Sequence, residues 1–119
     1  MPIADFKRGD TKTYKFLFTK NNAPLDITGW DVWCTFKTDP ETQPDNEAVL
    51  QVQATAGGHI ADDPVNGVMY LTLTSIDTAI DVGQYFYDFQ RVIPGSPPNV
   101  VTLDSGQVTI EQDVTLSDA

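Results

Sequence analysis

The residue types that most often carry catalytic or metal chemistry meet in residues 57–63, Gly-Gly-His-Ile-Ala-Asp-Asp. His59 is the only histidine of the chain, and imidazole is the usual general base near neutral pH. A histidine without a partner forms no catalytic constellation, whereas His59 with Asp62 and Asp63 is a conceivable metal site. An exposed loop histidine beside turn-forming aspartates explains the same residues more simply. We therefore expect no metal site and no cofactor.

The other candidate nucleophiles and acids also have structural explanations. Cys34 is the only cysteine and lies between Val32 and Phe36 on an alternating apolar face, where a small buried hydrophobe is expected. It cannot form an internal disulfide, which suits a reducing cytosol. Asp88 interrupts an aromatic run, and we interpret it as a structural acid bonded to backbone amides, to Arg91 or to a lysine. No spacing among the seventeen acids favours one catalytic pair, so we predict that the chain is not an enzyme.

Several other motifs argue against particular functions. The chain lacks both the alternating Asp/Asn spacing of a calcium loop and a glycine loop that cradles phosphate ahead of a helix. Residues 8–10, Arg-Gly-Asp, spell a tripeptide that some receptors recognise, but a turn that uses the backbone freedom of Gly9 is the simpler explanation. No apolar run approaches the roughly 20 residues that span a bilayer, and no signal-peptide pattern begins the chain. We expect a cytosolic chain that does not insert into membranes.

The elements that must position these residues are strands. Apolar and polar residues alternate between turn signals along most of the chain, and no long helical pattern is present. Residues 11–18, for example, place Tyr14, Phe16 and Phe18 on one face and Lys15 on the other. This pattern predicts a half-buried strand with its lysine in water.

Residues 30–37 repeat the alternation and raise a question about one tryptophan. The predicted core face holds Trp30, Val32, Cys34 and Phe36. Trp33 falls on the opposite, polar face. Either that face is partly covered, or Trp33 is an exposed anchor for a partner, and the sequence leaves both interpretations open.

The remaining pattern predicts more short strands and one short helical turn. The predicted strands are residues 49–54, 68–74 and 83–93, followed by a hairpin of residues 100–103 and 107–114 around a turn at 104–106. We expect a helical turn at residues 75–80, with Ile76 and Ile80 capping the core, and an exposed acidic loop at 38–47. About seven to nine strands in one domain, residues 1–119, predict an all-β, antiparallel two-sheet sandwich. A small closed barrel is the competing architecture.

Charge is unevenly distributed along the chain. Seventeen acids and seven bases give a net charge of −10, which makes nucleic acid an unexpected partner. Residues 1–20 hold five bases and two acids, a balance of +3, so the remaining 99 residues carry −13. Copies arranged head to tail could place Lys7, Arg8, Lys12 or Lys15 near acids of the next copy. The alternative is that these charges are satisfied within one monomer.

Four segments in order resemble one known family. They are residues 6–11 (Phe-Lys-Arg-Gly-Asp-Thr), 23–30 (Ala-Pro-Leu-Asp-Ile-Thr-Gly-Trp), 83–88 (Gly-Gln-Tyr-Phe-Tyr-Asp) and 102–110 with 113–115. Their order resembles the immunoglobulin-like domain of tailed-phage virion proteins, notably the N-terminal domain of baseplate upper proteins. The resemblance implies an immunoglobulin-like sandwich that builds a tail, baseplate or neck by binding copies of itself and neighbouring virion proteins. It also implies a virion location, with assembly in the host bacterial cytoplasm.

The resemblance has a limit, and alternatives remain. Baseplate upper proteins continue into regions that carry receptor-binding subunits, and this sequence ends at Ala119, so host recognition is not transferred. Our principal hypothesis is a non-enzymatic assembly or adaptor module whose interface includes Lys7, Arg8, Lys12, Lys15 and Trp33. An alternative is a carbohydrate-binding or surface-decoration module that uses Trp33 and exposed tyrosines as stacking platforms. A glycosidase is a third hypothesis.

Overall fold

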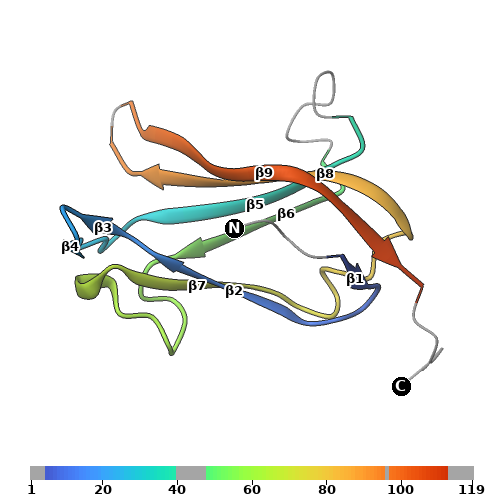
Figure 1. Ribbon diagram of the computed structural model, residues 1–119, viewed down its shortest axis with the longest axis horizontal. Helices are drawn as coiled ribbons and strands as arrows, with labels where there is room; N and C mark the ends of the chain where they lie inside the picture. The colour runs from blue at the N-terminus through green and yellow to red at the C-terminus, as the bar shows by residue number, and fades with distance from the viewer. Residues whose placement is uncertain (1–4, 40–47, 96, 113–119) are drawn as a thin grey trace.

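The computed structural model describes residues 5–39, 48–95 and 97–112, and most of them lie in strands (Figure 1). The strands are β1 (Phe6–Lys7), β2 (Lys12–Leu17), β3 (Thr19–Lys20), β4 (Ala23–Pro24), β5 (Asp31–Lys37), β6 (Leu50–Thr55), β7 (Val68–Leu73), β8 (Gly83–Ile93) and β9 (Asn99–Glu111). The short 3-10 helix η2 (Pro64–Asn66) is the helical element of the described residues. The all-β prediction is confirmed.

Two sheets form the sandwich. The larger has the strand order β1-β9-β8-β5-β6, and the smaller pairs β2 with β7, while β3 and β4 form a separate short hairpin. All of these pairs are antiparallel except β1 with β9, which is parallel. Immunoglobulin domains have strands C, F and G in one sheet and strands B and E in the other. The same division is found here, with β5, β8 and β9 in the larger sheet and β2 and β7 in the smaller. The structure therefore has the predicted immunoglobulin-like arrangement.

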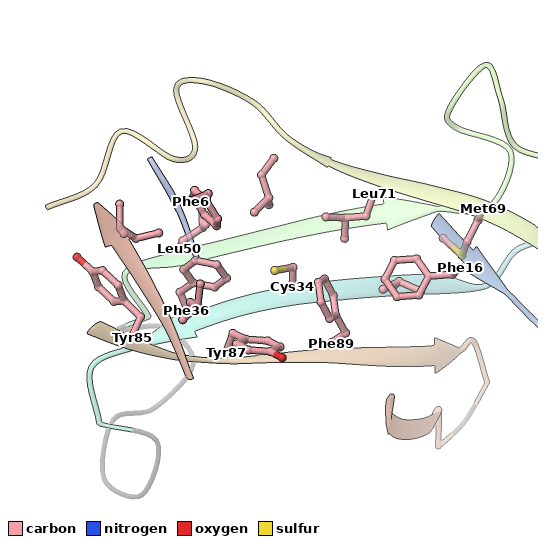
Figure 2. Packing of buried hydrophobic residues seen from close by; sticks show 14 of the residues in the cluster. Phe6, Phe16, Cys34, Phe36, Leu50, Met69, Leu71, Tyr85, Tyr87 and Phe89 are labelled. Atoms are coloured by element: carbon pink, nitrogen blue, oxygen red, sulfur yellow. The ribbon is translucent and has the colours of Figure 1, made fainter. Parts of the chain in front are cut away.

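The core lies between the two sheets and is rich in aromatic rings (Figure 2). Phe16 on β2 meets Phe89 on β8 edge to face, with 5.2 Å between ring centroids. Such contacts add to the free energy gained by burying apolar area. The predicted inner faces are confirmed, because Val32, Cys34 and Phe36 are fully buried. The whole cluster contains Phe6, Phe16, Ile27, Val32, Cys34, Phe36, Leu50, Met69, Leu71, Leu73, Tyr85, Tyr87, Phe89, Val108 and Ile110.

A tyrosine corner marks the start of β8. The Tyr85 hydroxyl donates a hydrogen bond to the Asp81 carbonyl oxygen, at 2.6 Å and four residues upstream. This is the corner found near the start of strand F in immunoglobulin domains. Tyr87 then stands where antibody domains carry the second cysteine of their disulfide, and Cys34 is a free buried thiol. Aromatic packing takes the place of a disulfide in this core.

The predicted helical turn at residues 75–80 is only partly realised. Thr78 N–H donates to the Thr74 carbonyl, and buried Thr78 bonds through its hydroxyl to the Asp10 carbonyl at 2.6 Å. Ile80 packs against the core as expected, but Ile76 is 85% exposed, so the prediction for Ile76 is wrong. The segment is a turn anchored by Thr78, because this buried hydroxyl rather than an apolar helix face ties it to the sandwich.

The predicted closing hairpin is also wrong, because β9 continues through residues 104–106. Asp104, Ser105 and Gly106 pair with Phe89, Asp88 and Tyr87 on β8, and the ladder shifts register near Leu103. A Cβ at Gly106 would lie 3.3 Å from the Tyr87 ring, so the glycine serves close packing. Pairing along the whole of β8 overrides the local turn preference of Asp-Ser-Gly.

A tight turn at Asn66 and Gly67 leads into β7. Gly67 follows η2 with a left-handed φ of 77°, and its N–H donates to the Pro64 carbonyl. A Cβ there would collide with the Phe18 carbonyl, so glycine is required for both reasons. The predicted acidic loop lies mostly outside the described residues, and its first two, Thr38 and Asp39, are exposed.

Candidate functional site

The loop that carries His59 is organised around a carboxylate and has a structural role. Asp62 accepts hydrogen bonds from the backbone N–H groups of Gly57, His59 and Tyr70, at 2.9, 3.0 and 2.7 Å. The His59 Nδ1 atom accepts from Ala61 N–H, and its ring stacks on Tyr70 at 5.2 Å. Within residues 5–39, 48–95 and 97–112, no three metal-ligating side chains lie close enough together to hold an ion.

Cys34 and Tyr14 lie in surroundings that favour their neutral forms. Burial, followed by the nearby charges of Asp88 and Asp77, raises the pKa of the Cys34 thiol. Burial, followed by Cys34 and Tyr87, raises the pKa of Tyr14 to about 12. A thiol and a phenol that stay protonated near neutral pH are poor nucleophiles. Both residues therefore act as part of the core.

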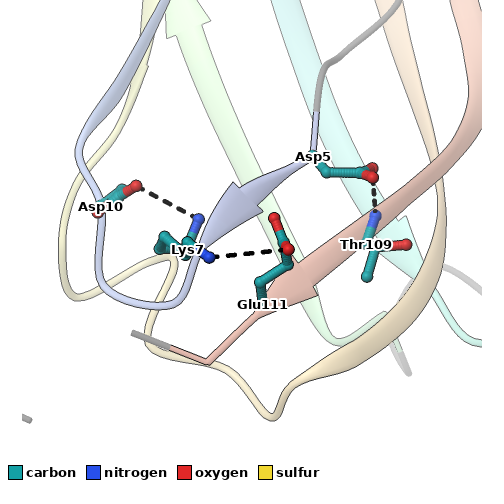
Figure 3. Close-up of polar contacts among 5 residues, drawn as sticks. All are labelled: Asp5, Lys7, Asp10, Thr109 and Glu111. Atoms are coloured by element: carbon teal, nitrogen blue, oxygen red, sulfur yellow. Dashed lines mark hydrogen bonds and ion pairs between the residues drawn. The ribbon is translucent and has the colours of Figure 1, made fainter. Parts of the chain in front are cut away.

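Two of the predicted interface bases, Lys7 and Arg8, make contacts within the monomer. Lys7 Nζ lies 3.7 Å from Glu111 Oε2 across the β1–β9 pair, as Figure 3 shows. Arg8 donates from Nε to the Ile80 carbonyl at 2.9 Å and from Nη2 to the Ala79 carbonyl at 3.3 Å. Gly9 has a φ of 85° and Asp10 N–H donates to the Lys7 carbonyl, so Arg-Gly-Asp is the expected turn. Lys7 therefore pairs with an acid of the same copy, and Arg8 is held by backbone carbonyls of the same copy.

The other two predicted bases lie on opposite faces of β2. Lys12 Nζ sits 5.8 Å from the centroid of the Phe6 ring, a cation–π contact near the β1 end of the core. Lys15 is exposed on the outer face and pairs in register with Tyr70. The structure thus gathers Lys7, Arg8 and Lys12 near β1 and separates Lys15 from them. Their contribution to an interface stays a prediction.

Trp33 is partly buried on the outer face of the five-stranded sheet. It pairs in register with Gln53 on β6 and Gln90 on β8, so the face around it is polar. A groove of about 390 Å³ lies on this sheet, lined by Thr35, Lys37, Phe86, Tyr87, Asp88, Ser105, Gly106 and Gln107. The grouping of Phe86 with polar side chains depends on cross-strand register, which the sequence pattern alone did not show.

The structure places two tyrosines of β8 in the core and separates Asp88 from Arg91. Tyr85 and Tyr87 are buried, so they are not exposed stacking platforms. Arg91 lies over the Trp30 ring at 5.1 Å and donates to the Asn99 side chain, on the opposite face of the strand from Asp88. Asp88 instead lines the groove. Strand alternation separates residues three apart onto opposite faces, so Arg91 is not the partner of Asp88. The other predicted partners, backbone amides or a lysine, stay predictions.

The first half of β9 is an exposed edge that the sequence interpretation missed. Among the described residues, β1 pairs with β9 only at Ile110 and Glu111. Asp5 Oδ1 also accepts a hydrogen bond from Thr109 N–H at 2.9 Å (Figure 3). Val100, Val101 and Leu103 are 50%, 41% and 36% exposed. The signal available in the sequence was the uncharged, β-branched run of residues 99–103, Asn-Val-Val-Thr-Leu.

Neither a model of a known protein family nor a curated protein matches this chain. Across the described part of the chain, no helix has the length and hydropathy needed to cross a bilayer. Function is therefore inferred from the residues, their contacts and the fold.

Proposed function

We propose that this chain is a non-enzymatic virion structural protein of a tailed phage, acting as an assembly or adaptor module of the tail, baseplate or neck. The segments that carry the resemblance to the phage immunoglobulin-like domain lie in strands of the sandwich and in the segments that join them. Residues 6–11 form β1 and its turn, 23–30 lead from β4 to β5, 83–88 begin β8, and 102–110 lie in β9. Residues 113–115 lie outside the described residues.

The observation that carries an assembly role is the open edge of β9. Strand edges offer unpaired N–H and C=O groups, and sandwiches usually protect them with charges, proline or a covering segment. Here β1 and Asp5 protect one end of β9, while Val100 and Val101 stay exposed at the other. An exposed apolar strand edge is suited to binding another chain. Its partners in the proposal are other copies of this chain and neighbouring virion proteins.

The proposal predicts that the chain is part of the particle. Mass spectrometry of purified particles of the phage that encodes it should detect the chain at a fixed ratio to known tail or head proteins. Its gene should lie among the clustered genes of that structural module. Particles that lack the chain would overturn the proposal, whatever its behaviour in isolation.

The basic first segment can be tested separately with a matched pair of lysines. Lys15 and Lys20 are both exposed, but only Lys15 belongs to the predicted interface. If head-to-tail contacts use Lys15, Lys15→Glu should weaken self-association at low salt and Lys20→Glu should not. The two variants are matched because each removes one base and adds one acid. Light scattering measures the average mass. Equal effects of the two variants would count against a specific role for Lys15.

The groove favours one alternative function, carbohydrate binding. Phe86 offers a partly buried ring, and Thr35, Asp88, Ser105 and Gln107 line the same groove. Aromatic stacking with flanking polar groups is a common way to bind sugars. Titration with host polysaccharide should change the fluorescence of Trp33, which lies on the same sheet face, and Phe86→Ala should abolish the change. An unchanged spectrum of the wild-type protein would argue against this function.

A further inference from the structure

The free part of the β9 edge is bounded at both ends. Towards the C-terminal end, Asp5 bonds to Thr109 N–H and β1 pairs with Ile110 and Glu111. Towards the other end, Pro97 and Pro98 precede the strand and cannot donate to a ladder. The register shift near Leu103 interrupts regular pairing. Residues 99–103 therefore form a short, bounded segment for strand addition.

The two edges of the five-stranded sheet differ in what they expose. On β6, the outward residues Gln51, Gln53 and Thr55 are polar. On β9, Val100 and Val101 lie on opposite faces of the strand and are both about half exposed, at 50% and 41%. An uncharged apolar edge lacks the charged side chains that usually protect a strand against pairing. The β9 edge is therefore the better docking site.

We propose that residues 99–103 pair antiparallel with the same residues of a second copy, around a two-fold axis at Val101. In this arrangement Val101 faces Val101 of the second copy, and Val100 faces Thr102. Cross-strand pairs of β-branched residues stabilise antiparallel sheets. A two-fold axis also uses the same patch on both copies and closes the assembly at a dimer. The two five-stranded sheets become one continuous sheet.

Charge favours a second copy at this segment. With a net charge of −10, copies of the chain repel one another over most of their surface. Residues 99–103 contain no charged side chain, and Asp104 lies outside the paired segment. Two copies therefore meet here without placing like charges opposite one another. This pairing names one partner for the assembly role proposed above and rests on that role.

Salt distinguishes this dimer from the contact predicted for Lys15. Screening reduces repulsion between two acidic bodies, so added salt should tighten a dimer held by an uncharged edge. It should weaken a contact between basic and acidic surfaces. Sedimentation of the full chain at low and high salt measures both, and dissociation that increases with salt would overturn the β9 pairing.

Substitution at the two-fold axis provides the decisive test. Val101→Lys places two like charges opposite each other and should raise the dimer dissociation constant at least about tenfold. Gln53→Lys is the matched control, because it adds the same charge to the other edge and should leave the dimer intact. Mixing Val101→Lys with Val101→Glu should restore dimers, since opposite charges then face each other. The restored dimer excludes misfolding as the cause of the loss.

Hydrogen exchange locates the contact. The amides of residues 99–103 should gain protection as protein concentration rises, whereas those of β6 should not. A wild-type chain that stays monomeric at high salt and high concentration, or a dimer that Val101→Lys leaves unchanged, would overturn the inference. A chain found in particles but monomeric in solution would leave the virion role standing without this dimer. If the chain is missing from particles but forms a Val101-dependent dimer, the β9 pairing stands and the virion role is overturned.

Discussion

The two halves of β9 share one backbone ladder with β8 but differ in their other surroundings. In the second half, Val108 and Ile110 are each 1% exposed, and β1 and Asp5 protect the outer edge. In the first half, Val100 and Val101 are exposed, and within the described residues no further strand covers the edge. The second half thus contributes to stability, while the first is available for binding.

This difference arises from neighbours far away in the sequence. Phe6 pairs with Ile110, and Asp5 bonds to Thr109, across more than a hundred residues. Near the β8–β9 turn, Arg91 lies over the ring of Trp30, which is only partly buried. A strand can therefore change from core to edge while it stays paired with the same neighbouring strand.

The largest predicted effect is a difference in unfolding free energy between a variant in the second half of β9 and one in the first half. Ile110→Ala should lower the free energy of unfolding by about 3 kcal/mol, because it leaves a cavity in a packed core. Val101→Ala should lower it by less than about 0.5 kcal/mol, because the side chain is exposed. Urea denaturation measures both. Similar losses for the two variants would contradict a difference in stability between the two halves of β9.

A smaller effect is expected at the tyrosine corner beside the second half. Tyr85 pairs with Val108, and its hydroxyl bonds to the Asp81 carbonyl. Tyr85→Phe should cost about 1 kcal/mol through the lost hydrogen bond. Tyr70→Phe, at a partly exposed position, is the matched control and should change the unfolding free energy less. A Tyr85→Phe chain as stable as the wild type would show that the corner adds no stability.

Removing the Asp5 cap should affect the edge locally. Asp5→Ala takes away the acceptor for Thr109 N–H, so exchange of this amide with solvent should become severalfold faster. Asp5→Asn retains an acceptor oxygen and should preserve most of the protection. Exchange of the Val101 amide, measured by NMR, should be unchanged, because the Asp5 carboxylate does not bond to it. Equal acceleration at both amides would indicate general loosening instead.

The smallest effect is expected for the ion pair of Lys7 with Glu111. Their side chains are 43% and 48% exposed, and exposed pairs contribute little after solvent screening. Lys7→Ala should lower the free energy of unfolding by at most about 0.5 kcal/mol, and the difference should vanish at high salt. Denaturation at two salt concentrations checks this. A larger loss that persists in salt would mean that Lys7 supports the β1–β9 pair mainly through packing.

Much of the fold could be predicted from local patterns, and the errors have identifiable causes. Val32, Cys34 and Phe36 are buried because their alternation is a local property of one strand. The turn expected at residues 104–106 is absent because pairing with β8 was stronger than its local preference. Ile76 is exposed because Thr78 supplies the anchor of its loop. Each of these competing contacts involves residues outside the segment concerned, so the local sequence pattern does not predict it.

The candidate surfaces were less predictable than the core. Lys7, Arg8, Lys12 and Lys15 were recognisable as a basic segment. The contacts of the first three nevertheless come from β9, from residues 79 and 80, and from Phe6. The groove beside Phe86 requires the register of three strands. The open edge of β9 requires knowledge of where β1 stops. Each depends on long-range pairing.

The sequence by itself determined that this chain is all-β, because alternation selects strands and assigns each side chain to a face. The tertiary structure decided for two sheets over a closed barrel. The sequence also determined the charge imbalance and the uncharged run at residues 99–103. Only the tertiary structure decided which strand edge is covered and which is open. Side-chain alternation contains no information about a strand's neighbours, since these are chosen by contacts between residues as distant as Phe6 and Ile110.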